Sequence, residues 1–268
     1  MDSSTKGYIY ALSKAEYKTM QCPFCGGQTA YKGKESFCTI CESYLGPKTD
    51  GPSHSGSLTS VNADVLNGAT DKLDGFLKAN PKLLSEPGML YGVGTLYAIA
   101  SSYKYHDLYY AREGFMEQNS SNVYASLSMV SRSKEFFYRT LDSLEKLQGV
   151  DPVSLYLEFI TNMRLNRILD ARAALNKMAL MNKESAVLLY ANMVYAVGTR
   201  SKSAMDHIET LAGNGEPNSF YYFARHQAQA RKLEDAEAML SVITEKFKMP
   251  MAAYMLQDLR TLASKTST

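Results

Sequence analysis

The stretch LEDAEAMLSVITEKF, residues 233–247, carries the pattern that decides the fold. Its residues Leu233, Ala236, Leu240, Ile243 and Phe247 follow one another at steps of 3, 4, 3 and 4. Steps of this kind place small and apolar side chains on one face of an α-helix. The stretch therefore predicts an amphipathic helix with one buried side.

The same helical face recurs in the second half of the chain at a nearly constant interval. Its central residue recurs at intervals of 34, 33 and 32 residues, at Phe137, Ala171, Ala204 and Ala236. A second helix is expected before each of these, centred on Ala125, Phe159, Ala191 and Ala224. Turn residues punctuate the units at Asp151-Pro152, at Gly213 to Pro217 and at Met249-Pro250. A two-helix unit of this length is the period of a helical repeat, so we expect a mainly α fold, an α-solenoid of antiparallel helical hairpins.

The unit resembles the tetratricopeptide repeat over about residues 118–250. Phe137 and Phe159 stand where that repeat prefers small residues, and no unit has its tryptophan or leucine-glycine pair, so a generic solenoid of helical hairpins stays open. The resemblance implies that the first helices line a concave groove that holds a protein or peptide. Carried over position by position, the candidate partner-binding residues are Asn122, Tyr156, Arg164, Asn192, Tyr195, Tyr221 and Arg225.

All four cysteines lie within CPFCGGQTAYKGKESFCTIC, residues 22–41. Cys22 and Cys25 form one C-x2-C pair, and Cys38 and Cys41 form a second one after 12 intervening residues. Two such pairs can present four thiolates to one tetrahedral ion. The residues between them predict a β-hairpin with its turn at Gly33, and the flanking YIYAL (8–12) and KTM (18–20) could add strands.

The CPFCGG start resembles a zinc ribbon, which implies one structural zinc ion held by Cys22, Cys25, Cys38 and Cys41. The second pair, in CTICES, lacks the glycine that usually follows in that family. A rubredoxin-like iron site and a framework of two disulfides remain as alternatives. A catalytic zinc is disfavoured, because such a site keeps one position open and four thiolates would close it. We expect a chelator to unfold residues 5–45 and to leave the helical part intact.

Composition divides the chain into three zones: a zinc ribbon at 1–46, a flexible linker at 47–60 and a tetratricopeptide-like helical domain at 61–268. The linker zone is rich in Gly, Pro, Ser and Thr, which offer little to bury. Breaks at Asn80-Pro81 and Glu86-Pro87 indicate further helices between 61 and 117. Six tyrosines crowd residues 91–110, and we expect them to be either core or a recognition surface.

The net charge of +2 does not by itself indicate a polyanionic partner. We find no phosphate-binding loop, no H-E-x-x-H motif and no G-x-S-x-G motif in the sequence, and therefore predict no enzymatic activity and no small-molecule substrate. No signal or membrane-spanning run is evident, and the paired thiols are typical of a reducing compartment, so we expect a cytoplasmic protein.

These observations favour a non-enzymatic adaptor that binds a protein or peptide in the helical groove. A first alternative is a nucleic-acid-binding protein that uses the ribbon as its contact module. Its cations and aromatic rings would be Lys14, Lys18, Tyr31, Lys32, Lys34 and Phe37. A second alternative is the regulatory subunit of an enzyme complex.

Overall fold

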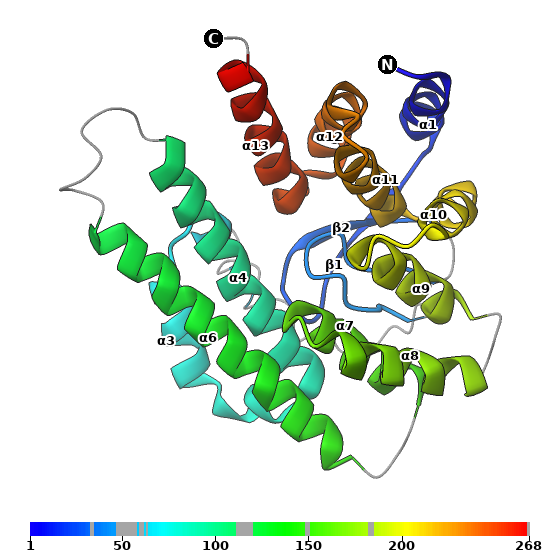
Figure 1. Cartoon of the computed structure of the whole chain (residues 1–268). Coiled ribbons are helices and arrows are strands. Elements are labelled where there is room, and N and C mark those ends of the chain that lie inside the picture. Colours follow the sequence, from blue (N-terminus) through cyan, green and yellow to red (C-terminus); the bar gives the residue numbers. More distant parts are fainter. Residues whose placement is uncertain are drawn as a thin grey trace. The chain divides into compact units, whose positions relative to one another are not determined.

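The structure is a computed structural model that describes residues 1–32, 35–46, 58, 62, 64–110, 120–147, 151–181 and 185–266. It is mainly helical, with a small sheet in which β1 pairs with β2 (Figure 1). In chain order the elements are α1 (Ser3–Lys14), β1 (Lys18–Gln21), β2 (Gln28–Tyr31), α3 (Asp71–Ala79), the 3-10 helix η1 (Pro81–Ser85), α4 (Pro87–Tyr110), α6 (Ser120–Glu145), α7 (Pro152–Arg164), α8 (Ile168–Met181), α9 (Ala186–Gly198), α10 (Ala204–Gly213), α11 (Pro217–Gln229), α12 (Leu233–Phe247) and α13 (Pro250–Thr266).

Contacts within the chain define two compact units. Unit 1 consists of Met1–Met20, Thr29–Thr49 and Asp151–Thr268, and unit 2 of Gln21–Gln28 and Asp50–Val150. Each unit combines segments that are far apart in the sequence, and the units do not test the predicted division into ribbon, linker and helical domain. That division stays a prediction. Most of the expected linker lies outside the described residues; Leu58 is the exception, and its side chain is fully buried.

Three consecutive pairs of neighbouring helices build most of unit 1: α7 with α8, α9 with α10, and α11 with α12. They begin and end near the turn residues that the sequence predicts, and prolines open α7, α11 and α13. A proline is tolerated in the first helical turn, because the N–H group it lacks would have no partner there. The six central residues of these helices are completely buried: Phe159, Ala171, Ala191, Ala204, Ala224 and Ala236.

The three pairs share one turn geometry. Asn166, Arg200 and Arg231, each just beyond the end of a first helix, have left-handed φ angles of 59°, 56° and 62°. The residue after each of them donates its N–H to a carbonyl five residues earlier, at 2.8, 2.8 and 2.9 Å. This is the bond pattern of a Schellman cap, which satisfies the last carbonyls of a helix. Recurrence of one cap shows that the repeat in the sequence is also a repeat of local structure.

The expected hairpin around Ala125 and Phe137 is wrong. Both residues lie on one continuous helix, α6, which runs from Ser120 to Glu145. No glycine or proline occurs in this stretch, so nothing in the local sequence interrupts the helix. Among the described residues, the periodic pattern therefore corresponds to three helix pairs, from α7 to α12. The further pair that it predicts before them is a single helix.

The possible strand at YIYAL is also wrong, because residues 8–12 lie within α1. Asp2 caps this helix by accepting the N–H of Thr5 at 2.8 Å. Within unit 1 the helix packs on the helical pairs, with the rings of Tyr8 and Phe223 centred 4.3 Å apart. The Lys246 ammonium donates to the carbonyl of Leu12 at 2.5 Å and therefore satisfies a backbone group at the end of α1.

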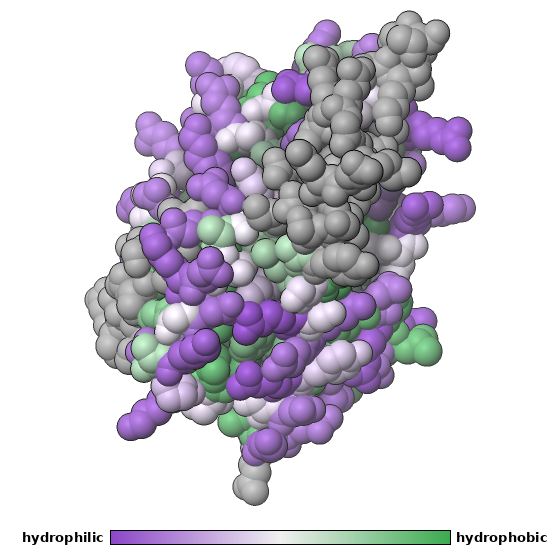
Figure 2. All heavy atoms as spheres, turned by 90° about the vertical axis from the view of Figure 1, so that its left-hand side faces the viewer, coloured by the Kyte–Doolittle hydropathy of each residue, from purple (hydrophilic) through white to green (hydrophobic). Residues whose placement is uncertain are grey.

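Unit 2 centres on α4 and α6, which run side by side in Figure 1. The rings of Tyr91 and Tyr97 are fully buried, against Phe137 and Phe136 respectively. These two tyrosines are therefore core. The side chains at 105, 109 and 110 lie outside the description. Figure 2 shows the face on this side of the molecule, where hydrophilic side chains predominate over the coloured part and hydrophobic ones lie between them in small groups.

Candidate functional site

The four cysteines come together, as the sequence predicts. Their sulfur atoms all lie within 4.8 Å of one another, and each side chain is fully buried. Four tetrahedral thiolates on an ion at about 2.3 Å would have sulfur atoms about 3.8 Å apart, so the cluster is near the required size. The four cysteines are not joined by disulfides. The cluster could hold a metal ion.

The two cysteine pairs have the same loop geometry. In the first, Cys22 donates its N–H to the Gly27 carbonyl at 2.9 Å, and Gly26 donates to the Cys22 carbonyl at 3.0 Å. In the second, Cys38 donates to Ser43 and Glu42 donates to Cys38, both at 2.9 Å. Backbone turns therefore position both pairs before any ion is considered.

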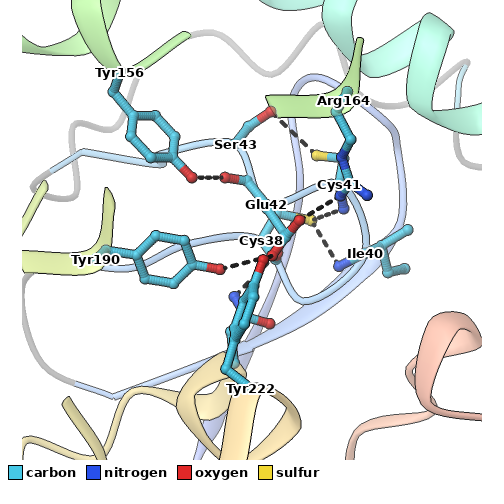
Figure 3. Close-up of polar contacts among 10 residues, drawn as sticks. Cys38, Ile40, Cys41, Glu42, Ser43, Tyr156, Arg164, Tyr190 and Tyr222 are labelled. Atoms are coloured by element: carbon cyan, nitrogen blue, oxygen red, sulfur yellow. Dashed lines mark hydrogen bonds and ion pairs between the residues drawn. The ribbon is translucent and has the colours of Figure 1, made fainter. Parts of the chain in front are cut away.

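The second loop also places polar groups around its sulfurs. The Cys41 thiol donates to the Ser43 hydroxyl at 3.2 Å, and the N–H groups of Ile40 and Cys41 both donate to the Cys38 sulfur at 3.4 Å (Figure 3). Hydrogen bonds of this kind stabilise thiolates and orient them toward a metal. The donor set therefore fits a thiophilic divalent ion.

A left-handed residue closes each loop. Gly26 has a φ of 70°, and a Cβ there would also lie 2.6 Å from the backbone of Leu58. The corresponding residue of the second loop is Glu42, with a φ of 63°. The missing glycine thus does not prevent the turn. A left-handed conformation is unfavourable for a residue with a Cβ, so contacts of the Glu42 side chain must offset this cost.

Glu42 is 8 % exposed, and its side chain is held by three helices of unit 1. Tyr222 and Tyr190 donate their hydroxyls to one carboxylate oxygen at 2.5 and 3.1 Å, and Arg164 forms an ion pair with the other oxygen. Tyr156 donates to the Glu42 carbonyl at 2.7 Å. Figure 3 shows these side chains pointing toward Glu42 from α7, α9 and α11. We call Tyr156, Arg164, Tyr190 and Tyr222 the Glu42 cradle.

The electrostatics keep the cradle in a donating state. Burial, together with the nearby negative charge of Glu42, raises the pKa of Tyr190 and of Tyr222 well above the ordinary value. Both hydroxyls therefore remain protonated and can donate to the carboxylate. Arg225 adds a second cation, with its guanidinium 5.4 Å from the centre of the Tyr222 ring.

A ring contact and a backbone contact join the same loop to the helices. The Phe37 ring stacks on that of Tyr190, with centres 3.7 Å apart, and Phe37 pairs by its backbone with Tyr44. Asn218 of α11 donates to the Cys38 carbonyl at 3.4 Å. The expected hairpin, in which Thr29–Lys32 would pair with Ser36–Phe37 across Gly33, is not the pairing observed among the described residues. Instead β2 pairs with β1, and Phe37 pairs across its own cysteine loop. Each cysteine pair is therefore flanked by its own pairing.

Glu216, at the start of α11, is a further buried acid in unit 1. It caps the helix by accepting the N–H of Asn218 at 3.2 Å. Burial raises its pKa to about 8, and the charge of Glu42 acts in the same direction. Near neutral pH this carboxyl is therefore largely protonated.

The predicted groove residues are found in different surroundings. Tyr156 and Arg164 contact Glu42, while the half-buried Tyr221 and Arg225 lie next to each other on α11, with the guanidinium 5.8 Å from the ring centre. Asn192 and Tyr195 are half-buried on α9, and the side chain of Asn122 lies outside the description. Whether any of the seven predicted residues, Asn122, Tyr156, Arg164, Asn192, Tyr195, Tyr221 and Arg225, binds a partner stays a prediction.

Sequence reasoning missed Glu42, Tyr190 and Tyr222. A signal for the tyrosines existed, since Tyr156, Tyr190 and Tyr222 follow at intervals of 34 and 32 residues and so occupy one position of three successive units. Glu42 had no comparable signal, because its contacts depend on how the loop folds against the helices.

Comparison with known protein families, with curated proteins and with solved structures found no match for this chain. Among the described residues, every helix is too short or too polar to cross a membrane. The function must therefore be argued from the site itself.

Proposed function

We propose that the chain is a non-enzymatic adaptor: a zinc ribbon joined to an α-solenoid of tetratricopeptide-like hairpins that binds a segment of another protein through the side of α7, α9 and α11. The observation that carries this proposal is the alignment of Tyr156, Tyr190 and Tyr222. These residues occupy one position in three successive units and converge on a non-helical segment. A surface that holds one non-helical loop through hydroxyl and guanidinium donors has the chemistry to hold another segment.

The metal in this proposal is a single structural zinc ion on Cys22, Cys25, Cys38 and Cys41. Four buried thiolates support a closed tetrahedral shell, in which zinc would cross-link two loops and leave no position open for substrate. Elemental analysis of the purified protein should find one zinc per chain. One iron per chain with a visible absorption band would support the rubredoxin-like alternative instead.

A nucleic-acid interface on the ribbon is less well supported. Tyr31 and Phe37, the rings that would stack on bases, are 7 % and 1 % exposed. Stacking requires an accessible ring face. No observation favours the alternative of a regulatory enzyme subunit over an adaptor in general.

Capture experiments on the full chain test the adaptor proposal. We expect protein partners to remain bound after nuclease treatment and at raised salt, whereas binding carried by nucleic acid falls steeply with salt. The double variant Asn192→Ala/Tyr195→Ala should reduce capture, with Asn176→Ala on the exposed side of α8 as its matched control. Recovery of nucleic acid alone, with no effect of the double variant, would contradict the proposal.

A further inference from the structure

Residues 37–44, which contain the second cysteine pair, contact the side of α7, α9 and α11. This is the surface on which the proposed function places a partner segment. Residues 37–44 contribute a buried aromatic ring, Phe37, and a buried carboxylate, Glu42, to the helices that the proposed function assigns to partner binding. We infer that this segment is a built-in occupant of the Glu42 cradle and that an acidic partner segment binds there by displacing it. The inference rests on the proposed function and adds to it the chemistry and the regulation of the site.

The contacts of Glu42 indicate that the helices hold the occupant by its carboxylate. The first cysteine loop closes with Gly26, which adopts a left-handed φ without strain, and the second closes with Glu42 at a φ of 63°. A metal-binding loop gains nothing from glutamate at this position, since glycine would form the same turn. The carboxylate is thus explained by its contacts with Arg164, Tyr190 and Tyr222.

The charges around the cradle fit an acidic segment. Arg164 and Arg225 supply two guanidinium groups near the one carboxylate of Glu42. A partner that brings a carboxylate can form the guanidinium and hydroxyl contacts that Glu42 now forms. A partner that brings lysine or arginine would place like charges together.

The aromatic contact specifies the other half of the partner. Phe37 stacks on Tyr190 at 3.7 Å and lies 5.3 Å from Tyr156, measured between ring centres. An aromatic side chain close in space to a carboxylate is therefore the expected recognition element. The segment that carries it should form a tight loop, since residues 39–41 form a turn and Phe37 pairs by its backbone with Tyr44.

Metal binding would hold the occupant in place. Cys38 and Cys41 lie within the segment, so an ion on the four sulfurs would tie it to Cys22 and Cys25. The same ion would favour the turn in which Glu42 reaches the cradle. Loss of the ion should therefore make the cradle more accessible.

A peptide of residues 35–46, with serine in place of both cysteines and a fluorescent label, is a direct probe. Its anisotropy is titrated with full-length, zinc-loaded protein, either unaltered or carrying Glu42→Gly. Glycine keeps the left-handed turn and all four cysteines, so the variant retains the metal site and loses only the carboxylate. We expect the variant to bind the peptide at least tenfold more tightly than the unaltered protein does.

Three controls make the result specific. The protein variant Glu16→Gln, which neutralises an exposed acid, should bind as weakly as the unaltered protein. A peptide with glutamine in place of Glu42 should bind the Glu42→Gly protein at least tenfold more weakly than the parent peptide. Removal of metal from the unaltered protein by a chelator should strengthen peptide binding. Should Glu42→Gly lose its helical circular dichroism, Glu42→Gln replaces it.

The outcomes separate this inference from the proposed function. If the unaltered protein and the Glu42 variants bind the peptide with equal affinity, residues 37–44 do not block the cradle, and the inference is wrong. The proposed binding surface on α7, α9 and α11 would not be contradicted by that result. If the peptide binds no form of the protein, including the metal-free one, the proposed binding surface on α7, α9 and α11 is contradicted as well.

Discussion

At the scale of single residues, Glu42 is the residue whose contacts connect the candidate metal site to the helices. Its burial and its position beside Cys41 join the second cysteine loop to three helices of unit 1. A buried charge is tolerated only when hydrogen bonds and an opposite charge replace water, and the cradle supplies both.

Removal of this carboxylate should destabilise the protein. In Glu42→Ala the Arg164 guanidinium loses its partner while still partly buried, so we expect a loss of about 2–4 kcal/mol in the free energy of unfolding. Glu42→Gly should cost about 1 kcal/mol less than Glu42→Ala, because glycine relieves the left-handed strain. Urea unfolding measures both, with Glu16→Gln as a control that should stay within about 0.5 kcal/mol. Equal losses of unfolding free energy in Glu42→Ala and Glu42→Gly would show that the left-handed backbone at this position is not strained.

Glu216 should give unfolding a distinct pH dependence. Its folded pKa of about 8 lies above the ordinary value of 4.5, so between these values the folded state binds the proton more tightly than the unfolded state. Its contribution to stability is therefore full below pH 4.5 and is lost as the pH rises toward 8. Glu216→Gln keeps an acceptor for Asn218 and should flatten this decline, by on the order of 1–3 kcal/mol across the interval. Identical pH profiles for both proteins would rule out a buried neutral carboxyl.

At the scale of elements, close packing in unit 2 depends on glycines of α4. A Cβ at Gly92 would lie 2.2 Å from the backbone carbonyl oxygen of Phe24, and backbone cannot rotate away as a side chain can. This helix therefore approaches the first cysteine loop at a distance that glycine alone allows.

Gly92→Ala should accordingly be destabilising by about 2–3 kcal/mol, since the loop or the helix must move. Gly75→Ala on α3 is the matched control, because nothing lies within 4 Å of the added Cβ. There the better helix propensity of alanine should stabilise by up to about 1 kcal/mol. Thermal melts compare the two, and equal melting temperatures would show that α4 does not pack as described.

The repeated caps make a second prediction at this scale. Asn166, Arg200 and Arg231 are exposed and left-handed, so glycine at any of them should stabilise by about 0.5–1 kcal/mol through relief of strain. Asp170→Gly, inside the first turn of α8, should instead destabilise. Stabilisation at one cap and not at the other two would show that the three turns are not equivalent in solution.

At the scale of the whole molecule, the contacts of the second cysteine loop alter what metal removal should do. The sequence predicts that a chelator unfolds residues 5–45 and spares the helices. Because Phe37 and Glu42 are buried on α7, α9 and α11, part of the helical region should loosen as well. The free energy of binding a metal ion would then be shared between the cysteine loops and the helices that hold Glu42.

Hydrogen exchange measured by mass spectrometry, with and without chelator, tests this expectation. Protection should fall in residues 37–44 and in α7, α9 and α11, whose side chains hold this loop, and much less in α8 and α10. If exchange rises in residues 5–45 alone, the expectation from the sequence is correct, and the helices do not depend on the metal.

The sequence by itself determined the features that depend on neighbouring residues. Helical periodicity and prolines predicted the helix pairs from α7 to α12, and two C-x2-C pairs predicted the thiol cluster, because capping, helix formation and tight turns are local. Where the pattern conflicted with local sequence, as at Ala125 and Phe137, the uninterrupted helix prevailed.

Only the tertiary structure decided what the second cysteine loop touches. The bonds from Glu42 to Tyr156, Arg164, Tyr190 and Tyr222 span 114, 122, 148 and 180 residues of chain. No local preference specifies such pairs. They form because burying one carboxylate requires several donors at once, and only the folded arrangement of three helices brings those donors to one point.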